Sequence, residues 1–158
     1  MRDCGEADLT VLDFDHLRDK TECVGALAAR GAPAARIRGE IDKCEVRCAN
    51  CHRRVTALRA GWTRVMGNVD DPQRRLPAPV RRNLRHVHRV LASSRCADCG
   101  ESDMTVLEFD HVGFKHADVS DMVWDVSLAT LEREIAQCEI RCCNCHRRAS
   151  AARRGAAA

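Results

Sequence analysis

Aromatic residues are scarce in this chain of 158 residues, which contains three Phe, two Trp and no Tyr. So few rings exclude an extended stacking platform of the kind that binds single strands without sequence preference. No run approaches the roughly 18 apolar residues that cross a bilayer, and the N-terminus does not resemble a signal peptide. We therefore expect a soluble cytoplasmic protein with no membrane partner.

Large apolar side chains are also few, because much of the 45% hydrophobic content is Ala and Cys. These residues bury little area each, so burial alone stabilises a small module weakly. The chain is too short for an enzyme with separate substrate and cofactor domains. We expect a compact site in a small fold that needs a further source of stability.

The net charge is only +3, which does not by itself indicate a nucleic-acid partner. The charge is unevenly distributed, however, since residues 72–95 include seven Arg and no acidic residue. Pro79 is expected to start an amphipathic helix in this segment. Its apolar stripe consists of Val80, Leu84, Val87 and Leu91.

Cysteine, by contrast, is abundant, with eleven residues. The odd count and the CxxC spacing favour metal-binding thiolates over a secreted disulfide framework. Cys96 and Cys99 form one CxxC, Cys142 and Cys145 form another, and four thiolates suit tetrahedral zinc. Zinc that binds only the folded state would stabilise a module of about 50 residues. A redox CxxC or four unrelated buried thiols explain the paired spacing less well.

The chain contains two copies of one sequence module. Residues 1–16 align with residues 96–111 without a gap and with eleven identities. Residues 40–54 align with residues 134–148, again with eleven identities. Two matching blocks in the same order predict two modules with the same fold.

Each copy predicts the same order of elements: a turn with Cys and Gly, a short strand, a variable loop, a helix, a second short strand and a CxxCHRR knuckle. The first strands are expected at residues 11–15 and 106–110. Ser127 is the expected N-cap of one loop helix, and Pro33 is expected to open the other. The resulting fold class is α+β.

The predicted domain bounds follow from the repeat and from a segment rich in Pro and Gly between the copies. They are 1–60 for the first module, 61–95 for a linker with the basic helix, 96–150 for the complete second module, and 151–158 for a tail with no evident fold.

The first copy lacks one thiol of the predicted zinc site. Its three aligned cysteines are Cys4, Cys48 and Cys51. Met1 stands where the second copy has Cys96. Three explanations remain open: Cys23 or Cys44 supplies the fourth ligand, the site is degenerate, or the module begins upstream of Met1.

The knuckles leave an Asp-His pair and a later His unexplained in each copy. These residues are Asp110, His111 and His146 in the second copy, and Asp15, His16 and His52 in the first. Adjacent strand residues point to opposite sides, so the acid and the imidazole can flank a group held at the strand end. Phosphodiester hydrolysis needs a base near the attacking water and a cation near the leaving oxygen. A neutral imidazole can take the proton, and an Asp with a second imidazole can hold a divalent cation.

The sequence CADCGESDMTVLEFDH, followed by CEIRCCNCHRR, resembles the zinc-knuckle branch of the HNH endonucleases, the ββα-metal nucleases. The resemblance covers residues 80–148 and, without the basic helix, residues 1–54. It implies two small zinc-stapled ββα-metal modules that hydrolyse DNA, with RNA left open as a substrate. It also implies a catalytic divalent cation, Mg²⁺ or another, besides structural Zn²⁺.

The resemblance assigns a role to each residue by position. In the second copy, His111 is the general base, Asp110 and His146 hold the catalytic cation, and Cys96, Cys99, Cys142 and Cys145 hold zinc. In the first copy, the equivalents are His16, Asp15 and His52, with Cys4, Cys48 and Cys51.

The chain departs from the HNH pattern at the middle letter. The Asn expected about nine residues before the last His falls on Gln137 in the second copy and on Lys43 in the first. A Gln can still hydrogen-bond a loop, whereas a Lys cannot accept a hydrogen bond. Asn50 and Asn144, beside the knuckles, are alternative orienting residues.

Basic residues near the predicted site are candidates for phosphate contact. Lys20 and Lys115 coincide in the repeat, although each is equally well explained as a solvated loop residue. Four further candidates begin the helix after each knuckle: Arg53, Arg54, Arg147 and Arg148. Their proximity to the metal site favours contact with a nucleic-acid backbone over an ordinary charged face.

Two functions compete for this sequence. The first is a metal-dependent HNH endonuclease, and the second is a non-catalytic tandem zinc module that binds nucleic acid. The zinc and Arg features fit both. The Asp-His pair with its later His favours the endonuclease, because a binding module has no need of it.

Overall fold

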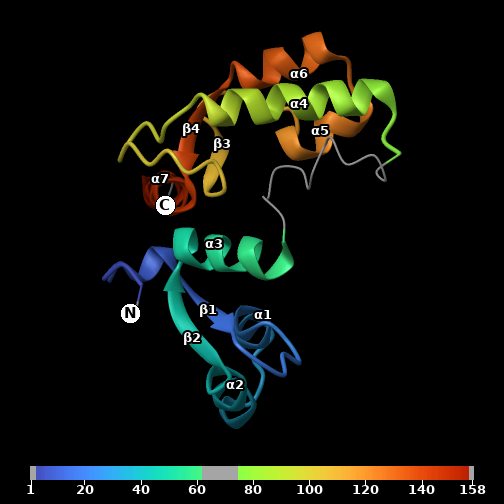
Figure 1. Ribbon diagram of the computed structural model, residues 1–158. Helices are drawn as coiled ribbons and strands as arrows, with labels where there is room; N and C mark the ends of the chain where they lie inside the picture. The colour runs from blue at the N-terminus through green and yellow to red at the C-terminus, as the bar shows by residue number, and fades with distance from the viewer. Residues whose placement is uncertain (1–2, 62–74, 157–158) are drawn as a thin grey trace. The chain divides into compact units, whose positions relative to one another are not determined.

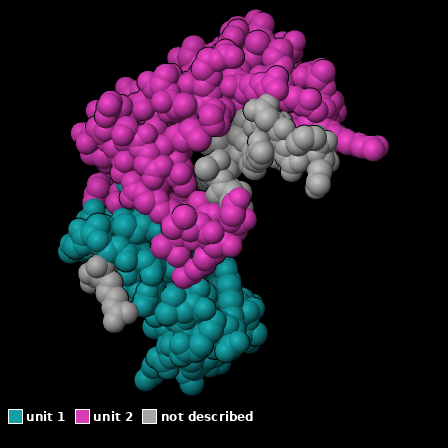
Figure 2. Space-filling model, in the orientation of Figure 1, with its two compact units in different colours: residues 1–52 teal, residues 53–158 magenta. Residues whose placement is uncertain are grey.

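The computed structural model describes residues 3–61 and 75–156. The chain divides into two compact units, residues 1–52 and 53–158, which are coloured separately in Figure 2. Each unit contains a two-stranded antiparallel sheet and short helices (Figure 1). The predicted α+β class is therefore confirmed. Within the described ranges, no helix is long and apolar enough to span a bilayer.

The first unit is organised around the pair of strands β1 and β2. Their bounds, with those of the neighbouring helices, are η1 Leu9–Val11, β1 Leu12–His16, α1 Val24–Ala29, α2 Ala34–Ile41, β2 Cys44–Cys48 and α3 Ala49–Ala60. The strands pair with Asp15 opposite Glu45. The boundary between the units falls within α3, so only its first turn belongs here. Val11, Cys48 and Cys51 form a small buried cluster with Leu12 packed against it, and Leu27 of α1 is also buried.

The second unit repeats this order after an additional N-terminal helix. Its elements are α4 Ala78–Ala92, β3 Leu107–His111, α5 Val119–Asp125, α6 Leu128–Ile135, β4 Cys138–Cys142 and α7 Cys143–Ala156. Strands β3 and β4 pair with Asp110 opposite Glu139, which matches the register of the first unit. Helix α7 starts directly after β4 and packs against both strands. The start of β3 is therefore paired with the end of β4, directly before the first turn of α7.

Helix α4 provides much of the apolar core of the second unit. The predicted stripe is confirmed, because Val80, Leu84, Val87 and Leu91 are all buried. Helix α4 packs against α5 and α6, which lie alongside it in Figure 1. The segment that the sequence analysis assigned to the linker therefore contributes to the core of the second unit.

The helix starts predicted at Ser127 and Pro33 agree with the structure. Helix α4 begins at Ala78, one residue before the predicted Pro79, and the first strand of each unit begins one residue later than expected. The Ser127 hydroxyl accepts a hydrogen bond from the Thr130 N–H at 3.2 Å, and Pro33 occupies the N-cap of α2. Each variable loop contains an extra short helix, α1 or α5, which the sequence analysis did not predict.

The expectation of an unfolded tail is wrong, because α7 continues as far as Ala156. Ala and Arg are strong helix formers, and extending a helix that has already started is far easier than starting one. The tail thus continues the helix that begins at Cys143. Residues 62–74 of the segment predicted as linker and basic helix, 61–95, lie outside the described residues.

Candidate functional site

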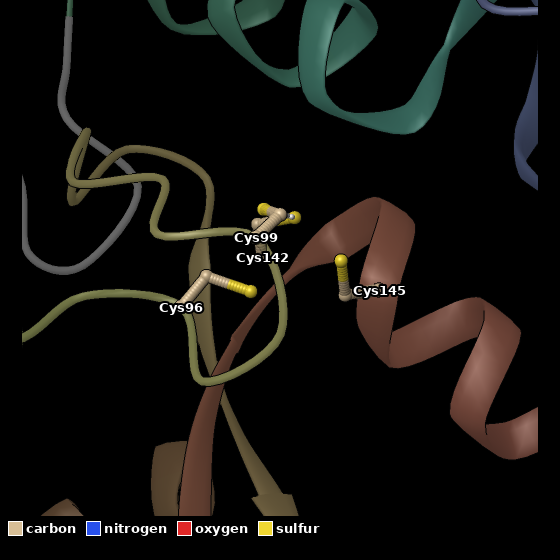
Figure 3. Close-up of side chains that lie close together, drawn as sticks. All are labelled: Cys96, Cys99, Cys142 and Cys145. Carbon is tan, nitrogen blue, oxygen red and sulfur yellow. Dashed lines mark hydrogen bonds between the residues drawn. The ribbon is translucent and has the colours of Figure 1, made fainter.

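Four cysteines converge at one end of the second sheet (Figure 3). Cys96 and Cys99 lie in the turn before β3, Cys142 ends β4, and Cys145 lies in the first turn of α7. Their sulfur atoms are all within 4.8 Å of one another. Four thiols at this spacing can hold a tetrahedral metal ion, and zinc is the ion that such a set suits best.

Backbone hydrogen bonds shape the Cys96 knuckle. The Gly100 N–H donates to the Cys96 carbonyl at 3.0 Å, and Gly100 adopts a φ of 76°, a conformation that favours glycine. Although burial raises it, hydrogen bonds from the backbone of Cys142, Cys99 and Asp98 lower the pKa of the Cys96 thiol to about 7. The fold therefore favours a thiolate at Cys96, whereas burial raises the pKa of the Cys99 and Cys145 thiols.

The first unit brings three thiols together. The sulfur atoms of Cys4, Cys48 and Cys51 lie within 4.8 Å of one another. Cys44 lies outside this cluster, with its thiol donating to the Glu40 carbonyl at 3.2 Å, and Cys23 is exposed at the N-cap of α1. Among the described residues, neither open candidate joins the three thiols. Met1, at the aligned fourth position, lies outside the described residues.

The predicted acid and the later imidazole meet in the second unit. His146 Nε2 lies 3.3 Å from Asp110 Oδ1. His146 Nδ1 lies 2.9 Å from Glu108 Oε2, and Glu108 shares a strand face with Asp110 because the two are separated by one residue. The imidazole thus has one nitrogen facing each carboxylate. Sequence reasoning missed Glu108, although its acidic counterpart Asp13 was visible in the repeat.

The first unit repeats this geometry with its own residues. His52 Nδ1 lies 3.2 Å from Asp13 Oδ2, and His52 Nε2 lies 3.5 Å from Asp15 Oδ1. Asp15 is 2% exposed, as is Asp110. Both copies therefore place a buried carboxylate close to a half-buried imidazole, and this imidazole directly follows a cysteine of the thiol cluster.

Two arginines hold the buried Asp110 carboxylate. Arg141 Nη1 lies 2.7 Å from Asp110 Oδ2, and Arg153 Nη2 lies 2.7 Å from Asp110 Oδ1. Burial raises the pKa of Asp110, but the hydrogen bonds from Arg153 and Arg141 outweigh it and lower the pKa. Asp110 is thereby kept ionised. Arg47 makes the equivalent ion pair with Asp15 in the first unit, at 2.8 Å.

His111 has a carboxylate partner on the opposite face of β3. Its Nε2 lies 2.9 Å from Glu134 Oε1, and the same oxygen accepts hydrogen bonds from the N–H groups of His116 and Ala117. Burial raises the pKa of the Glu134 carboxyl, and these hydrogen bonds bring it below the ordinary value. An ionised Glu134 fixes His111 with its proton on Nε2 and leaves Nδ1 as the acceptor.

The same dyad occurs in the first unit, where His16 Nε2 lies 3.1 Å from Glu40 Oε1. Sequence reasoning missed both glutamates. The sequence did contain a signal for them, because the same position of the second matching block is Glu in both copies, Glu40 and Glu134.

The middle position of the HNH pattern lies against the loop after each first strand. Gly113 lies close to Gln137, since a Cβ atom added at this glycine would be 3.2 Å from Gln137 Oε1. The Gln137 backbone carbonyl accepts a hydrogen bond from the Val112 N–H. In the first unit, Lys43 Nζ donates to the Asp19 carbonyl and to the Thr21 hydroxyl, both at 3.0 Å. Lys43 therefore holds its loop by donating hydrogen bonds. The alternatives Asn50 and Asn144 are buried in the first turns of α3 and α7.

The basic candidates lie on exposed loops and on the two helices that follow the knuckles. Lys20 is exposed, and Lys115 is exposed with its Nζ 2.7 Å from Asp118 Oδ1. The four arginines are half-buried, in α3 just after His52 and in α7 just after His146: Arg53, Arg54, Arg147 and Arg148.

Comparison of the chain with protein-family models, with curated proteins and with solved structures finds no match. The interpretation of the site therefore depends on its own geometry.

Proposed function

We propose that the chain is a metal-dependent endonuclease of the HNH type, built from two ββα-metal modules, that hydrolyses phosphodiester bonds in DNA. The observation that carries this proposal is the 3.3 Å approach of His146 Nε2 to Asp110 Oδ1 beside the four thiols. The equivalent approach of His52 to Asp15 in the first unit supports it. A module that only binds nucleic acid has no use for this pair, and here it occurs twice.

Asp110 and His146 would hold the divalent cation, because a carboxylate oxygen and an imidazole nitrogen form a suitable donor set for Mg²⁺, Mn²⁺ or Zn²⁺. The Glu108 carboxylate accepts the Nδ1 proton of His146 and leaves Nε2 with its lone pair directed toward Asp110. When bound, the cation neutralises charge on the phosphate and stabilises the departing 3′ oxygen.

His111 would act as the general base. Its Nδ1 takes a proton from the attacking water, while Glu134 holds Nε2–H and stabilises the imidazolium that forms. Because His111 and Asp110 are adjacent on β3, the base and a cation held by Asp110 would lie on opposite sides of the strand end. In-line displacement at phosphorus requires this separation of attacking and leaving oxygens.

A groove on α4 supports a nucleic-acid partner. It has a volume of about 490 Å³, and its lining includes four arginines with no acidic residue among them: Arg81, Arg82, Arg85 and Arg89. Guanidinium groups match the geometry of phosphate oxygens. Binding through such contacts weakens steeply as salt concentration rises.

A non-catalytic zinc module that binds nucleic acid is the second candidate. The thiol clusters and the arginine-lined groove support it as well as they support an endonuclease. The two candidates differ only in the use of Asp110, His111 and His146, so the deciding experiment changes one of these residues.

The experiment compares nicking of supercoiled plasmid DNA by the zinc-loaded chain and by His111→Ala, with Mg²⁺ or Mn²⁺ added. Loss of the general base is expected to slow nicking by about 10²- to 10⁴-fold, with zinc content and circular dichroism unchanged. His88→Ala is the matched control, because His88 is a half-buried histidine of α4 outside the site.

Nicking at an unchanged rate by His111→Ala would remove this residue from the mechanism. Absence of DNA cutting by the unmutated chain with any divalent cation would contradict the endonuclease and favour the binding module.

A further inference from the structure

A cavity of about 260 Å³ lies next to the proposed catalytic residues of the second unit. Helix α4 contributes Leu84, Val87 and Leu91 to its walls, and α5 contributes Val123 and Trp124. Apolar walls with a few polar groups are typical of pockets that bind small organic ligands. The volume falls just below the roughly 300–1,000 Å³ of pockets for drug-sized ligands, so the cavity suits a single planar ring system.

The polar lining of the cavity belongs in part to the proposed site. Glu108, His111 and His146 all line it. Asp118 and Ser120 add a carboxylate and a hydroxyl. A ligand in this cavity would therefore lie directly beside a phosphate held for hydrolysis, with hydrogen-bonding groups available to its edge.

Trp124 is the large aromatic side chain of the cavity that remains open to solvent. It is 49% exposed, although the chain contains few aromatic residues. Tryptophan presents a wide flat surface at little entropic cost, and partly exposed tryptophan is enriched where ligands bind. Its indole face offers a stacking surface for one ring system.

We propose that this cavity binds one unpaired nucleobase, stacked on Trp124, of the strand that is cut. The position of the phosphate rests on the proposed function. A base in a duplex is stacked on both faces and cannot enter a pocket for one ring, so the preferred substrate is single-stranded or locally unpaired DNA. The Ser120 hydroxyl and the Asp118 carboxylate, whose Oδ1 also pairs with Lys115, would supply hydrogen-bonding groups for the edge of the base.

The first unit does not offer this pocket. Its variable loop, residues 17–39, contains no aromatic residue, and in the described part of the chain no helix corresponding to α4 precedes its knuckle. The base-binding role therefore belongs to the second unit alone.

The test uses the fluorescence of Trp124 in the zinc-loaded full chain with Trp62→Phe, which makes Trp124 the sole tryptophan. The probes are a single-stranded oligodeoxyribonucleotide, its duplex, and an abasic strand with the same length and charge, all without added Mg²⁺ or Mn²⁺. Stacking predicts that the single strand quenches the fluorescence and that the duplex and the abasic strand do not. Equal quenching by all three would overturn the proposal.

Substitution tests the same contact by affinity, measured as fluorescence anisotropy of a labelled single strand. Trp124→Ala is expected to weaken binding by about 5- to 150-fold, whereas Trp124→Phe keeps a stacking ring and most of the affinity. Phe114→Ala is the matched control, an exposed aromatic that does not line the cavity, and is expected to change binding less than about 2-fold. Unchanged binding by Trp124→Ala would also overturn the proposal.

Cleavage with Mn²⁺ separates this proposal from the proposed function. Quenching by single strands without cleavage would leave the base pocket intact and contradict the endonuclease. Cleavage at equal rates of single-stranded, abasic and duplex DNA would support the endonuclease and contradict the base pocket.

Discussion

Asp110 is a buried carboxylate that the fold surrounds with cationic and imidazole groups. Arg141 and Arg153 neutralise its charge, and His146 Nε2 lies close to Oδ1, the oxygen that Arg153 also contacts. A buried carboxylate without such partners would gain a proton rather than stay ionised. The two arginines therefore keep Asp110 ionised.

The lowered pKa of Glu40 predicts that the stability of the fold depends on pH. The hydrogen bond from Lys43 and the backbone N–H of Thr21 lower the pKa of Glu40 from 4.5 to about 2. A carboxyl whose pKa is lower in the folded state stabilises folding above its unfolded pKa and loses this contribution as pH falls through the folded pKa. The contribution of Glu40 is therefore full above pH 4.5 and disappears by about pH 2.

The measurement is the urea midpoint of the unmutated chain and of Glu40→Gln between pH 7 and pH 2. The difference between the two midpoints is expected to be largest at pH 7 and to shrink below pH 4.5, whereas acid release of metal affects both chains equally. A difference that stays constant over this range would show that Glu40 has the same pKa in both states.

Some residues of the site could be predicted from sequence and others could not. Asp110 and His146 could be predicted because each lies in a sequence block that recurs in the other copy. Glu134 and Arg153 were missed because their partners are set by tertiary contacts, with Glu134 23 residues after His111 and Arg153 43 residues after Asp110. No local spacing reveals such a pair.

The strand pair β3–β4 and helix α7, which follows β4, do most to position the site. β3 presents Asp110 and His111 on opposite faces, and α7 presents His146 one residue after the second knuckle. The thiol cluster fixes the junction between β4 and α7, because Cys142 and Cys145 lie on the two sides of it. A metal ion at the thiols would hold these elements in register.

Helix starts were predictable because their signals are local, as at Ser127 and Pro33. The short helices α1 and α5 were not, because fewer than eight residues carry too weak a periodicity. They form because tertiary packing buries their apolar residues, Val24 and Leu27 in α1 and Met122 and Val123 in α5.

Hydrogen bonds from the Asn83 side chain attach α5 to α4. Its Nδ2 donates to the Val123 carbonyl at 3.2 Å and to the Val126 carbonyl at 2.9 Å, and its side chain is buried. Asn83→Ala leaves two carbonyls at the end of α5 without these donors, and is expected to lower the free energy of unfolding by about 1–3 kcal/mol.

The measurement is chemical denaturation of the zinc-loaded chain, followed by Trp124 fluorescence with Trp62→Phe. Arg82→Ala, an exposed change on the same helix, is the control and should alter stability by less than about 0.5 kcal/mol. Equal stability of Asn83→Ala and the control would show that these hydrogen bonds contribute nothing.

The chain carries the same site geometry in both units, and the residues around the site differ between the units. Both units have the buried carboxylate, its arginine and the two imidazoles. The second unit adds a fourth thiol, helix α4 and the cavity with Trp124. The second unit is therefore the one in which we expect the stronger activity.

The proposed mechanism requires that Asp110 and His146 hold a cation that takes part in phosphodiester hydrolysis. Its most direct test is the rate of plasmid nicking as Mn²⁺ is titrated into the zinc-loaded chain and into Asp110→Asn, which preserves the size of the side chain. We predict no nicking without Mn²⁺, a rate that rises and saturates in the unmutated chain, and a rate at least about 100-fold lower in Asp110→Asn with zinc content unchanged. Nicking by Asp110→Asn at the unmutated rate, with the same dependence on Mn²⁺, would contradict the claim.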